Sequence, residues 1–303
     1  MSQKSIREIL KVVQTLEIRS RRMAEEVFAG QYHSAFRGSG IDFDEVREYV
    51  PGDDVRSIDW NVTARSGRIF IKKYQEEREQ TFLLMIDVSG SGDFGSTGRS
   101  KREVAAELAS VLAFSAIRNR DRVGLLLFTD RVELIVPPRR GRSHVLRLIR
   151  EILFFEPLGR GTRPVVAIDA VSHLLKRRSV IFLMSDFLGA GCESAELVAL
   201  KPKLNSLNRK HDLVAVSVLD PREEELFPAG LLTLEDAETG ELREVDTGRE
   251  AVRSVYRQSF EGQRAQMRRV FRQAGIDGVE LRTDQSYMPV MRQFFKLRER
   301  RRR

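Results

Sequence analysis

The chain has 303 residues, 41% of them hydrophobic, and a net charge of +8 at pH 7, which is enough for one large domain with a buried core and a smaller unit beside it. No apolar run reaches the roughly 18 residues that a membrane span needs, and the first ten residues contain no signal-peptide core, so we expect a cytoplasmic protein. The single cysteine, Cys192, excludes an internal disulfide, and the four histidines are scattered without the spacing of a zinc site.

The N-terminal segment is predicted to be an amphipathic helix over residues 5–28. Its apolar residues recur at helical spacing and share one face: Ile6, Ile9, Leu10, Val13, Leu16, Met23 and Val27. We expect this face to pack on the protein's own core rather than in the groove of a partner.

Residues 36–78 form a region dense in Gly, Asp and Arg that ends in the strand-like segment Arg68–Ile71. Its aspartates allow two interpretations, a nuclease-type metal cluster or loops held by salt bridges to the arginines between them. The residues concerned are Asp42, Asp44, Asp53, Asp54 and Asp59, with Arg37, Arg47, Arg56 and Arg65. The interspersed arginines favour salt-bridged loops, to which we assign no chemistry. Because no Gly, Pro or Ser linker lies between Lys73 and Thr81, we expect residues 1–78 to pack on the following domain as a fixed platform.

Five short apolar runs are predicted to be strands buried on both faces, because their apolar character is continuous rather than alternating. The runs are Phe82–Ile86, Val123–Phe128, Val180–Met184, Leu213–Val218 and Val279–Leu281. Segments of helical period lie between them, which predicts a doubly wound, mostly parallel α/β sheet with helices on both faces. Two further strand-like segments, Leu231–Leu234 and Leu242–Val245, flank Thr239-Gly240 and predict a β-hairpin that leaves this sheet.

The positive charge is concentrated at the C-terminal end. Residues 249–303 contain 15 Lys and Arg and 6 Asp and Glu, a net charge of +9, so the preceding residues sum to −1. Within this part, Arg249–Ala274 is predicted to be an amphipathic helix with arginines on its polar face. The run Arg298–Arg303 is of a kind that attracts nucleic acid or an anionic membrane. No recognition module or aromatic stacking pattern accompanies it, so we expect a solvated, frayed tail.

Hydroxyl and carboxylate side chains stand where apolar strands end, in three loops far apart in the sequence. Asp87-Val88-Ser89-Gly90-Ser91 closes the first strand, Ser185-Asp186 closes the third, and Gly161-Thr162 precedes a helix that begins near Pro164. Ligands of parallel α/β sheets bind outside the carboxyl ends of the strands, where these loops lie. Because oxygen donors suit a hard divalent cation, the sequence predicts a site for Mg²⁺ or Mn²⁺.

The first of these loops also contains a Gly-x-Gly-x-x-Gly pattern, Gly90–Gly95, which after a strand is the dinucleotide-binding fingerprint. In a dinucleotide site the turn passes directly into a helix, whereas here residues 96–98 intervene before the helix that begins near Arg99. No acidic residue closes a second strand about 20 residues further on. We therefore disfavour a nucleotide site.

Two resemblances follow from these motifs. Asp87-Val88-Ser89-Gly90-Ser91 with Thr162 and Asp186 resembles the metal-ion-dependent adhesion site of von Willebrand factor type A domains. Residues 36–79, followed by LLMIDVSGS, DRVGLLLFTD, MSDF and HDLVAVSVLDPREEEL, are similar to the bacterial domain of unknown function 58 family. This second resemblance covers nearly the whole chain, to about Phe295, and the segment before the metal motif is its most specific part.

The resemblance implies a type A core with a short antiparallel edge strand at Val132–Val136, Mg²⁺ binding, and association with MoxR-type AAA+ ATPases. The metal ligands that it implies are the hydroxyls and carboxylates, bound directly or through water, of Asp87, Ser89, Ser91, Thr162 and Asp186. One coordination position would stay open for an acidic side chain of a partner. Arg163 stands where many relatives have Asp, and its guanidinium either weakens cation binding or helps to hold the partner's carboxylate.

We therefore expect an N-terminal unit over residues 1–78, a type A domain over residues 79–298 with the hairpin at about 221–248, and a basic tail over residues 299–303. The expected function is a Mg²⁺-dependent protein-interaction module, an adaptor for a MoxR-type ATPase in the maturation or remodelling of other proteins, and not an enzyme. A Mg²⁺-dependent hydrolase that uses Asp87 and Asp186 is the alternative. It is disfavoured because no His, Lys or further carboxylate in these loops is an evident general base. A nucleic-acid-binding protein that uses the basic C-terminal region is the third hypothesis.

Overall fold

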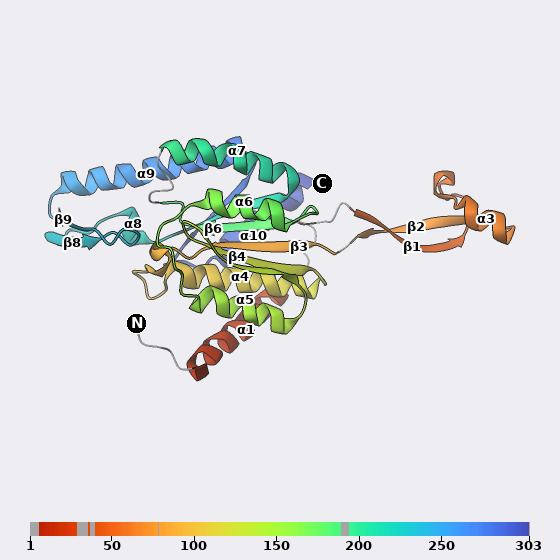
Figure 1. Ribbon diagram of the computed structural model, residues 1–303, viewed down its shortest axis with the longest axis horizontal. Coiled ribbons are helices and arrows are strands. Elements are labelled where there is room, and N and C mark those ends of the chain that lie inside the picture. The colour runs from red at the N-terminus through yellow and green to blue at the C-terminus, as the bar shows by residue number, and fades with distance from the viewer. Residues whose placement is uncertain (1–5, 29–35, 37–39, 78, 189–193, 303) are drawn as a thin grey trace.

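A six-stranded sheet forms the centre of the protein, whose structure is a computed structural model that describes residues 6–28, 36, 40–77, 79–188 and 194–302. The strand order is β10–β7–β6–β3–β4–β5, and all neighbouring pairs are parallel except β4 with β5 (Figure 1). The strands are β3 (Thr81–Asp87), β4 (Arg122–Phe128), β5 (Val132–Arg139), β6 (Val180–Ser185), β7 (Asp212–Leu219) and β10 (Asp277–Arg282). The predicted mostly parallel sheet, with its antiparallel edge strand, is confirmed.

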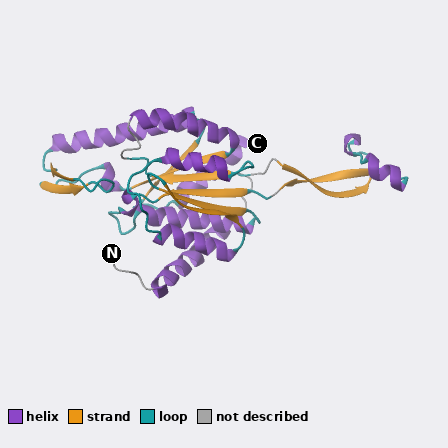
Figure 2. Cartoon of the chain, in the orientation of Figure 1, coloured by secondary structure: helices purple, strands orange, loops and turns teal. Residues whose placement is uncertain are grey.

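Helices cover both faces of this sheet (Figures 1 and 2). One core contains side chains of α1 (Ile6–Phe28), α4 (Lys101–Arg118), α5 (Arg142–Phe154) and α10 (Met288–Arg302), and the other contains side chains of α6 (Pro164–Leu174), α7 (Ser194–Lys210) and α9 (Glu250–Gln273). Successive side chains of β3 alternate between the two cores, with Leu84 in the first and Leu83 and Met85 in the second. Because both faces of the strand are buried, its sequence is continuously apolar. None of the described helices combines the length and apolar character that a membrane span requires.

Residues 40–77 form an arm that extends away from the sheet (Figure 1). Strands β1 (Gly40–Glu48) and β2 (Phe70–Glu77) pair antiparallel, and the 3-10 turn η1 (Val55–Ser57) and helix α3 (Trp60–Ser66) form the far end. The expectation of a single platform over residues 1–78 is therefore wrong for the arm. Its two strands pair with each other in a separate two-stranded sheet and not with the central sheet.

Helix α1, in contrast, packs on the body of the protein as expected. It lies against α4 and α5, and ion pairs join Glu17 to Arg142 and Arg19 to Glu107. Phe36, which precedes the arm in the sequence, is also anchored to the body, because its buried ring makes edge-to-face contacts with three other phenylalanines of the core.

The described aspartates of the arm stabilise its turns. Asp53 accepts two hydrogen bonds from the Arg47 guanidinium, at 2.9 and 2.7 Å, which confirms a salt-bridged loop. Asp54 accepts a backbone N–H at the start of η1, and Asp59 does the same at the start of α3. Arg37 and Cys192 lie outside the described residues, and so do the side chains of Asp42 and Asp44.

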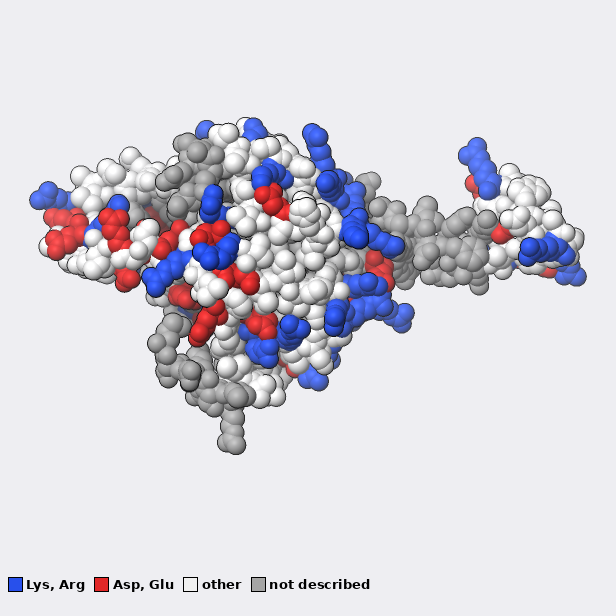
Figure 3. All heavy atoms as spheres, viewed as in Figure 1, with Lys and Arg blue, Asp and Glu red and all other residues white. Residues whose placement is uncertain are grey.

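The predicted hairpin, β8 (Leu231–Glu235) with β9 (Leu242–Asp246), lies at the end of the molecule opposite to the arm (Figure 1). The last helix, α10, continues through Arg302, so residues 298–302 of the run that we expected to be a frayed tail are helical. Arg298 is buried and pairs with Asp212 and Asp277, and Arg301 also pairs with Asp277. On the face seen in Figure 3, acidic side chains gather toward the hairpin and basic ones toward the arm.

Candidate metal centre

The three predicted loops meet at the carboxyl-terminal edge of the sheet. Asp87 ends β3, Asp186 follows β6, and Thr162 precedes α6. Strand β3 lies between β4 and β6 in the sheet. After β3 the chain forms β4 on one side of it, and only after α6 does it form β6 on the other side. This change of direction opens a crevice at the carboxyl ends of the strands, where α/β sheets bind their ligands. All five predicted ligand residues come together at this edge.

Three hydroxyls form the centre of the site. Ser89 Oγ lies 3.1 Å from Ser91 Oγ and 2.9 Å from Thr162 Oγ1. Ser89 and Thr162 are buried, and the 3-10 turn η2 (Gly90–Asp93) begins directly after Ser89, which brings the two serines to one side. The Gly90 N–H donates to the Arg160 carbonyl at 3.1 Å and so ties this turn to the loop that carries Thr162.

Both carboxylates of the site are buried and accept a backbone hydrogen bond from their own loop, and Asp87 also accepts a side-chain hydrogen bond from the end of β6. Asp87 accepts from the Ser89 N–H at 2.9 Å and from the Ser185 hydroxyl at 2.6 Å, and Asp186 accepts from the Leu188 N–H at 3.0 Å. Burial, followed by the nearby charge of Asp186, raises the pKa of the Asp87 carboxyl to about 6. A cation beside Asp87 would favour its ionised form again.

Lys101, the first residue of α4, adds a buried positive charge to the site. Its Nζ lies 2.6 Å from Asp186 Oδ2 and also pairs with Glu223 of the short helix α8 (Pro221–Glu224). Burial alone would lower the pKa of Lys101, but the charges of Asp186 and Glu223 raise it to about 12. The ammonium therefore stays charged at neutral pH and compensates one of the two carboxylates.

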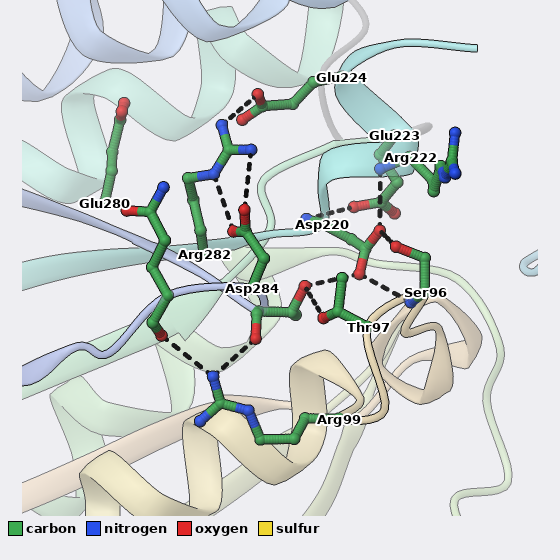
Figure 4. A network of polar contacts seen from close by, with 12 residues as sticks. Ser96, Thr97, Arg99, Asp220, Arg222, Glu223, Glu224, Glu280, Arg282 and Asp284 are labelled. Carbon is green, nitrogen blue, oxygen red and sulfur yellow. Dashed lines mark hydrogen bonds and ion pairs between the residues drawn. The ribbon is translucent and has the colours of Figure 1, made fainter. Parts of the chain in front are cut away.

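Asp220, at the end of β7, holds Glu223 in its place (Figure 4). The Asp220 N–H donates to the Glu223 carboxylate at 3.2 Å, while its own carboxylate accepts from the Ser96 N–H at 2.9 Å and the Thr283 hydroxyl at 2.6 Å. Burial alone would raise the pKa of Asp220, but these hydrogen bonds hold it below its ordinary value. The loop after η2 and the end of β10 are thus connected to Lys101 through Asp220 and Glu223.

A third carboxylate, Glu238 at the tip of the β8–β9 hairpin, also reaches the site. Its Oε1 lies 2.8 Å from Thr162 Oγ1. Burial is the main cause that raises the pKa of Glu238 to about 7. The hydrogen bond with Thr162 lowers this pKa, and the charges of Asp186 and Asp87 raise it further.

The donor set fits a small, hard cation. Adjacent ligands of an octahedral Mg²⁺, each about 2.1 Å from the metal, lie about 3.0 Å apart, and the neighbouring hydroxyl oxygens here are 2.9 and 3.1 Å apart. A cavity of about 20 Å³, lined in part by Asp87, Ser91 and Asp186, has room for one water molecule. The described residues contain no group of three or more His, Cys, Asp and Glu side chains arranged to hold a metal. Binding at this site would therefore depend on hydroxyl ligands, and the expected affinity is modest.

Three charged neighbours of the site were not predicted from the sequence. Lys101 had a local signal, because Ser100 caps a helix directly after the metal loop and that helix starts at the carboxyl edge of the sheet. Glu223 and Glu238 had none, since their positions depend on how the segment after β7 folds back over the site. Arg163 is exposed at the start of α6, next to Thr162, as its place in the sequence indicated.

Solved structures that are similar to this chain include BatB, a conserved hypothetical protein from Bacteroides thetaiotaomicron, and the SpRpn10 VWA domain. BatB has 15% sequence identity and a TM-score of 0.43, and the match covers 73% of this chain and 99% of BatB. The SpRpn10 VWA domain has 12% sequence identity and a TM-score of 0.39, and the match covers 69% of this chain and 92% of that domain.

Sequence relatives match either almost the whole chain or a part of it. The uncharacterized protein Rv1480 of Mycobacterium tuberculosis is 32% identical over 290 residues, which are 95% of this chain and 89% of that protein. The uncharacterized protein YeaD of Bacillus subtilis is 28% identical over 122 residues, 40% of this chain and 27% of YeaD. A family model described as "Protein of unknown function DUF58" matches residues 45–266. The chain therefore belongs to the DUF58 family.

Proposed function

We propose that the protein is a metal-dependent protein-interaction module that holds Mg²⁺ or Mn²⁺ at the edge of its sheet. The ligands would be the hydroxyls and carboxylates of Asp87, Ser89, Ser91, Thr162 and Asp186. The observation that carries the proposal is the convergence of two hydroxyl oxygens, from separate loops, within 3.1 Å of Ser89 Oγ. A bound cation would supply a Lewis-acidic position for a carboxylate oxygen of a partner.

The residues of the site favour an acidic side chain as the group that is recognised. Neutral hydroxyl ligands would not neutralise the positive charge of a bound cation, whereas a ligand set made of carboxylates would. Lys101 compensates Asp186, so Asp87 is the main negative charge among the proposed ligands. The exposed Arg163 guanidinium is the proposed second contact, through a charge-assisted hydrogen bond to the same carboxylate.

The family resemblance supports a MoxR-type AAA+ ATPase as the partner. In this proposal the protein acts as an adaptor for that ATPase in the maturation or remodelling of client proteins. The arm lies at the far end of the molecule from the metal centre, which leaves it available for a second contact in such an assembly.

The alternative of a Mg²⁺-dependent hydrolase is not favoured by the neighbours that the structure brings to the site. Lys101 has a pKa of about 12 and stays protonated, so it is no general base at neutral pH. Glu238 is an additional carboxylate, but its oxygen is held against Thr162. The interaction module remains our conclusion.

Capture of a co-encoded AAA+ ATPase by the immobilised protein tests this function. We expect capture in Mg²⁺, loss on adding a chelator, and loss in the Ser89→Ala/Ser91→Ala double variant. The bridge through the cation is comparable to a binding hot spot, so affinity should fall on the order of tenfold to a thousandfold. Ser259→Ala, which removes an exposed hydroxyl of α9, is the matched control and should bind as the wild type does. Capture that chelator and folded variants leave unchanged would exclude a metal-dependent contact.

A further inference from the structure

The tip of the β8–β9 hairpin lies on the metal centre. Glu238 is half-buried there, whereas Ala237 and Thr239 on either side of it are exposed. Glu238 Oε1 is 2.8 Å from Thr162 Oγ1, a spacing close to those among the three hydroxyls. Building on the proposed function, we propose that Glu238 is the chain's own acidic ligand of the metal centre, and that a partner's carboxylate binds by displacing this hairpin tip.

The backbone of the tip is packed against the metal loop, so the contact does not depend on one long side chain. A Cβ atom added at Gly90 would lie 2.2 Å from the Ala237 carbonyl oxygen, which is closer than any real contact. Gly90 lies between Ser89 and Ser91 in the sequence and contacts the backbone of the tip at Ala237. A glycine at this position is what allows the hairpin to close over the site.

The tip is also shaped so that Glu238 is presented to the site. The Asp236 carboxylate accepts the backbone N–H groups of Glu238 and Thr239, at 2.9 and 2.8 Å. The Gly240 N–H donates to the Asp236 carbonyl at 2.7 Å, and Gly240 has a φ of 72° that favours glycine. These bonds fix the backbone on both sides of Glu238 before any ligand arrives.

The charges explain why this carboxylate and a cation would stabilise each other. Glu238 joins Asp87 and Asp186 at one edge of the sheet, and Lys101, which contacts Asp186, is shared with Glu223. The negative charges of Asp186 and Asp87 act on Glu238, and like charges repel one another unless a cation lies between them. A cation at the hydroxyls would therefore hold the tip closed, and another carboxylate would compete with Glu238 for the same position.

The rest of the hairpin is built so that the tip can lift. Leu231 and Leu242, at opposite ends of its two strands, are 66% and 65% exposed, and two strands alone are marginally stable. The base is held separately, because the fully buried Thr247 donates its hydroxyl to the Gly230 carbonyl at 2.8 Å. Displacement at the tip would leave the base and the sheet in place.

Mn²⁺ binding tests this inference without a known partner, because calorimetry measures the affinity and water-proton relaxivity reports the number of waters on the bound ion. The main variant is Glu238→Gln. The second replaces residues 236–241 by an Asn-Gly turn, which fits because Glu235 pairs directly with Leu242. Glu235→Gln removes an exposed carboxylate from the same hairpin and is the control. Acetate serves as the probe for a partner's carboxylate.

Both variants that lack Glu238 should bind Mn²⁺ on the order of tenfold more weakly, because one charged ligand is lost. Their bound Mn²⁺ should show a higher relaxivity, since water takes the vacated position, and acetate should lower that relaxivity more than in the wild type. Glu235→Gln should match the wild type. Equal affinity and relaxivity in all four proteins would overturn the role of Glu238 and leave the metal site intact, whereas no Mn²⁺ binding by any of them would overturn both.

Discussion

At the scale of single residues, the buried Lys101 ammonium compensates negative charge at the candidate metal centre. Its side chain is 3% exposed and contacts Asp186 and Glu223. Lys101→Met leaves the Asp186 charge buried without compensation, which costs about 3 kcal/mol of stability. We expect urea unfolding at pH 7 to show a loss of this size, and Mg²⁺ to restore part of it because a cation near Asp186 replaces the ammonium.

A matched control is available on the surface. Lys203 pairs with the exposed Asp169 and is itself partly exposed, so Lys203→Met should change the free energy of unfolding by less than about 0.5 kcal/mol. An equal loss of unfolding free energy in the two variants would show that the buried Lys101 ion pairs stabilise the protein no more than the Lys203 pair does.

Asp121 gives the protein a pH-dependent stability at the edge of the sheet opposite to the metal centre. This buried carboxyl accepts the Gln80 N–H at 2.8 Å, and burial, with a smaller contribution from Glu79, raises its pKa to about 7. The folded pKa lies above the unfolded value of about 3.9, so the folded state binds the proton more tightly and stability falls as pH rises from about 4 to about 7. Asp121→Asn should be about 1 kcal/mol more stable than the wild type at pH 8 and equal to it near pH 4. Urea unfolding at the two pH values checks this, and a difference that does not vary with pH would contradict it.

The sequence predicted which hydroxyls and carboxylates meet at this edge better than it predicted their charged neighbours. Ser89 and Ser91 follow a strand at short spacing, so the strand end alone places them at the carboxyl edge of the sheet. Glu238 lies within a hairpin whose direction relative to Thr162 is set by packing at Gly90. No pattern in the sequence of the hairpin or of the loop around Gly90 indicates this direction.

At the scale of elements, the Phe36 ring fixes the chain to the core ahead of the arm. It contacts the rings of Phe82, Phe182 and Phe295 at centroid distances of 5.6 to 5.7 Å. Phe36→Ala would leave a cavity among them and should lower stability by about 3 to 4 kcal/mol, measured by urea unfolding. Trp60→Ala, at the far end of the arm where the ring is 69% exposed, should cost less than about 0.5 kcal/mol. A comparable cost for both would mean that the far end of the arm is buried against something else.

The central strands were predictable because burial on both faces makes them continuously apolar, whereas β1 was not predicted. A register shift between Phe43 and Glu45 interrupts the pairing of β1 with β2, and such a bulge breaks the alternation by which a two-stranded arm is recognised. The partner strand is also supplied from beyond α3, too far along the chain for a local signal. The arm thus depends on a long-range pairing that the sequence of β1 does not encode by itself.

At the scale of the whole molecule, the charge excess of the C-terminal part is partly neutralised within the fold. Arg264 and Arg268 pair with Glu280, and Arg298 and Arg301 pair with Asp277. Arginines that the sequence suggested for nucleic acid thus serve to join helices α9 and α10 to β10. The arm and the candidate metal centre lie toward opposite ends of the molecule (Figure 1).

Titration calorimetry of Mg²⁺ and Mn²⁺ into the purified protein tests the metal centre most directly. The wild type should bind one ion with modest affinity, Asp87→Asn and Ser89→Ala should lose most of that binding, and Ser259→Ala should retain it. Absence of binding in the wild type, or equal binding by the wild type and Asp87→Asn, would contradict a cation site at this edge of the sheet.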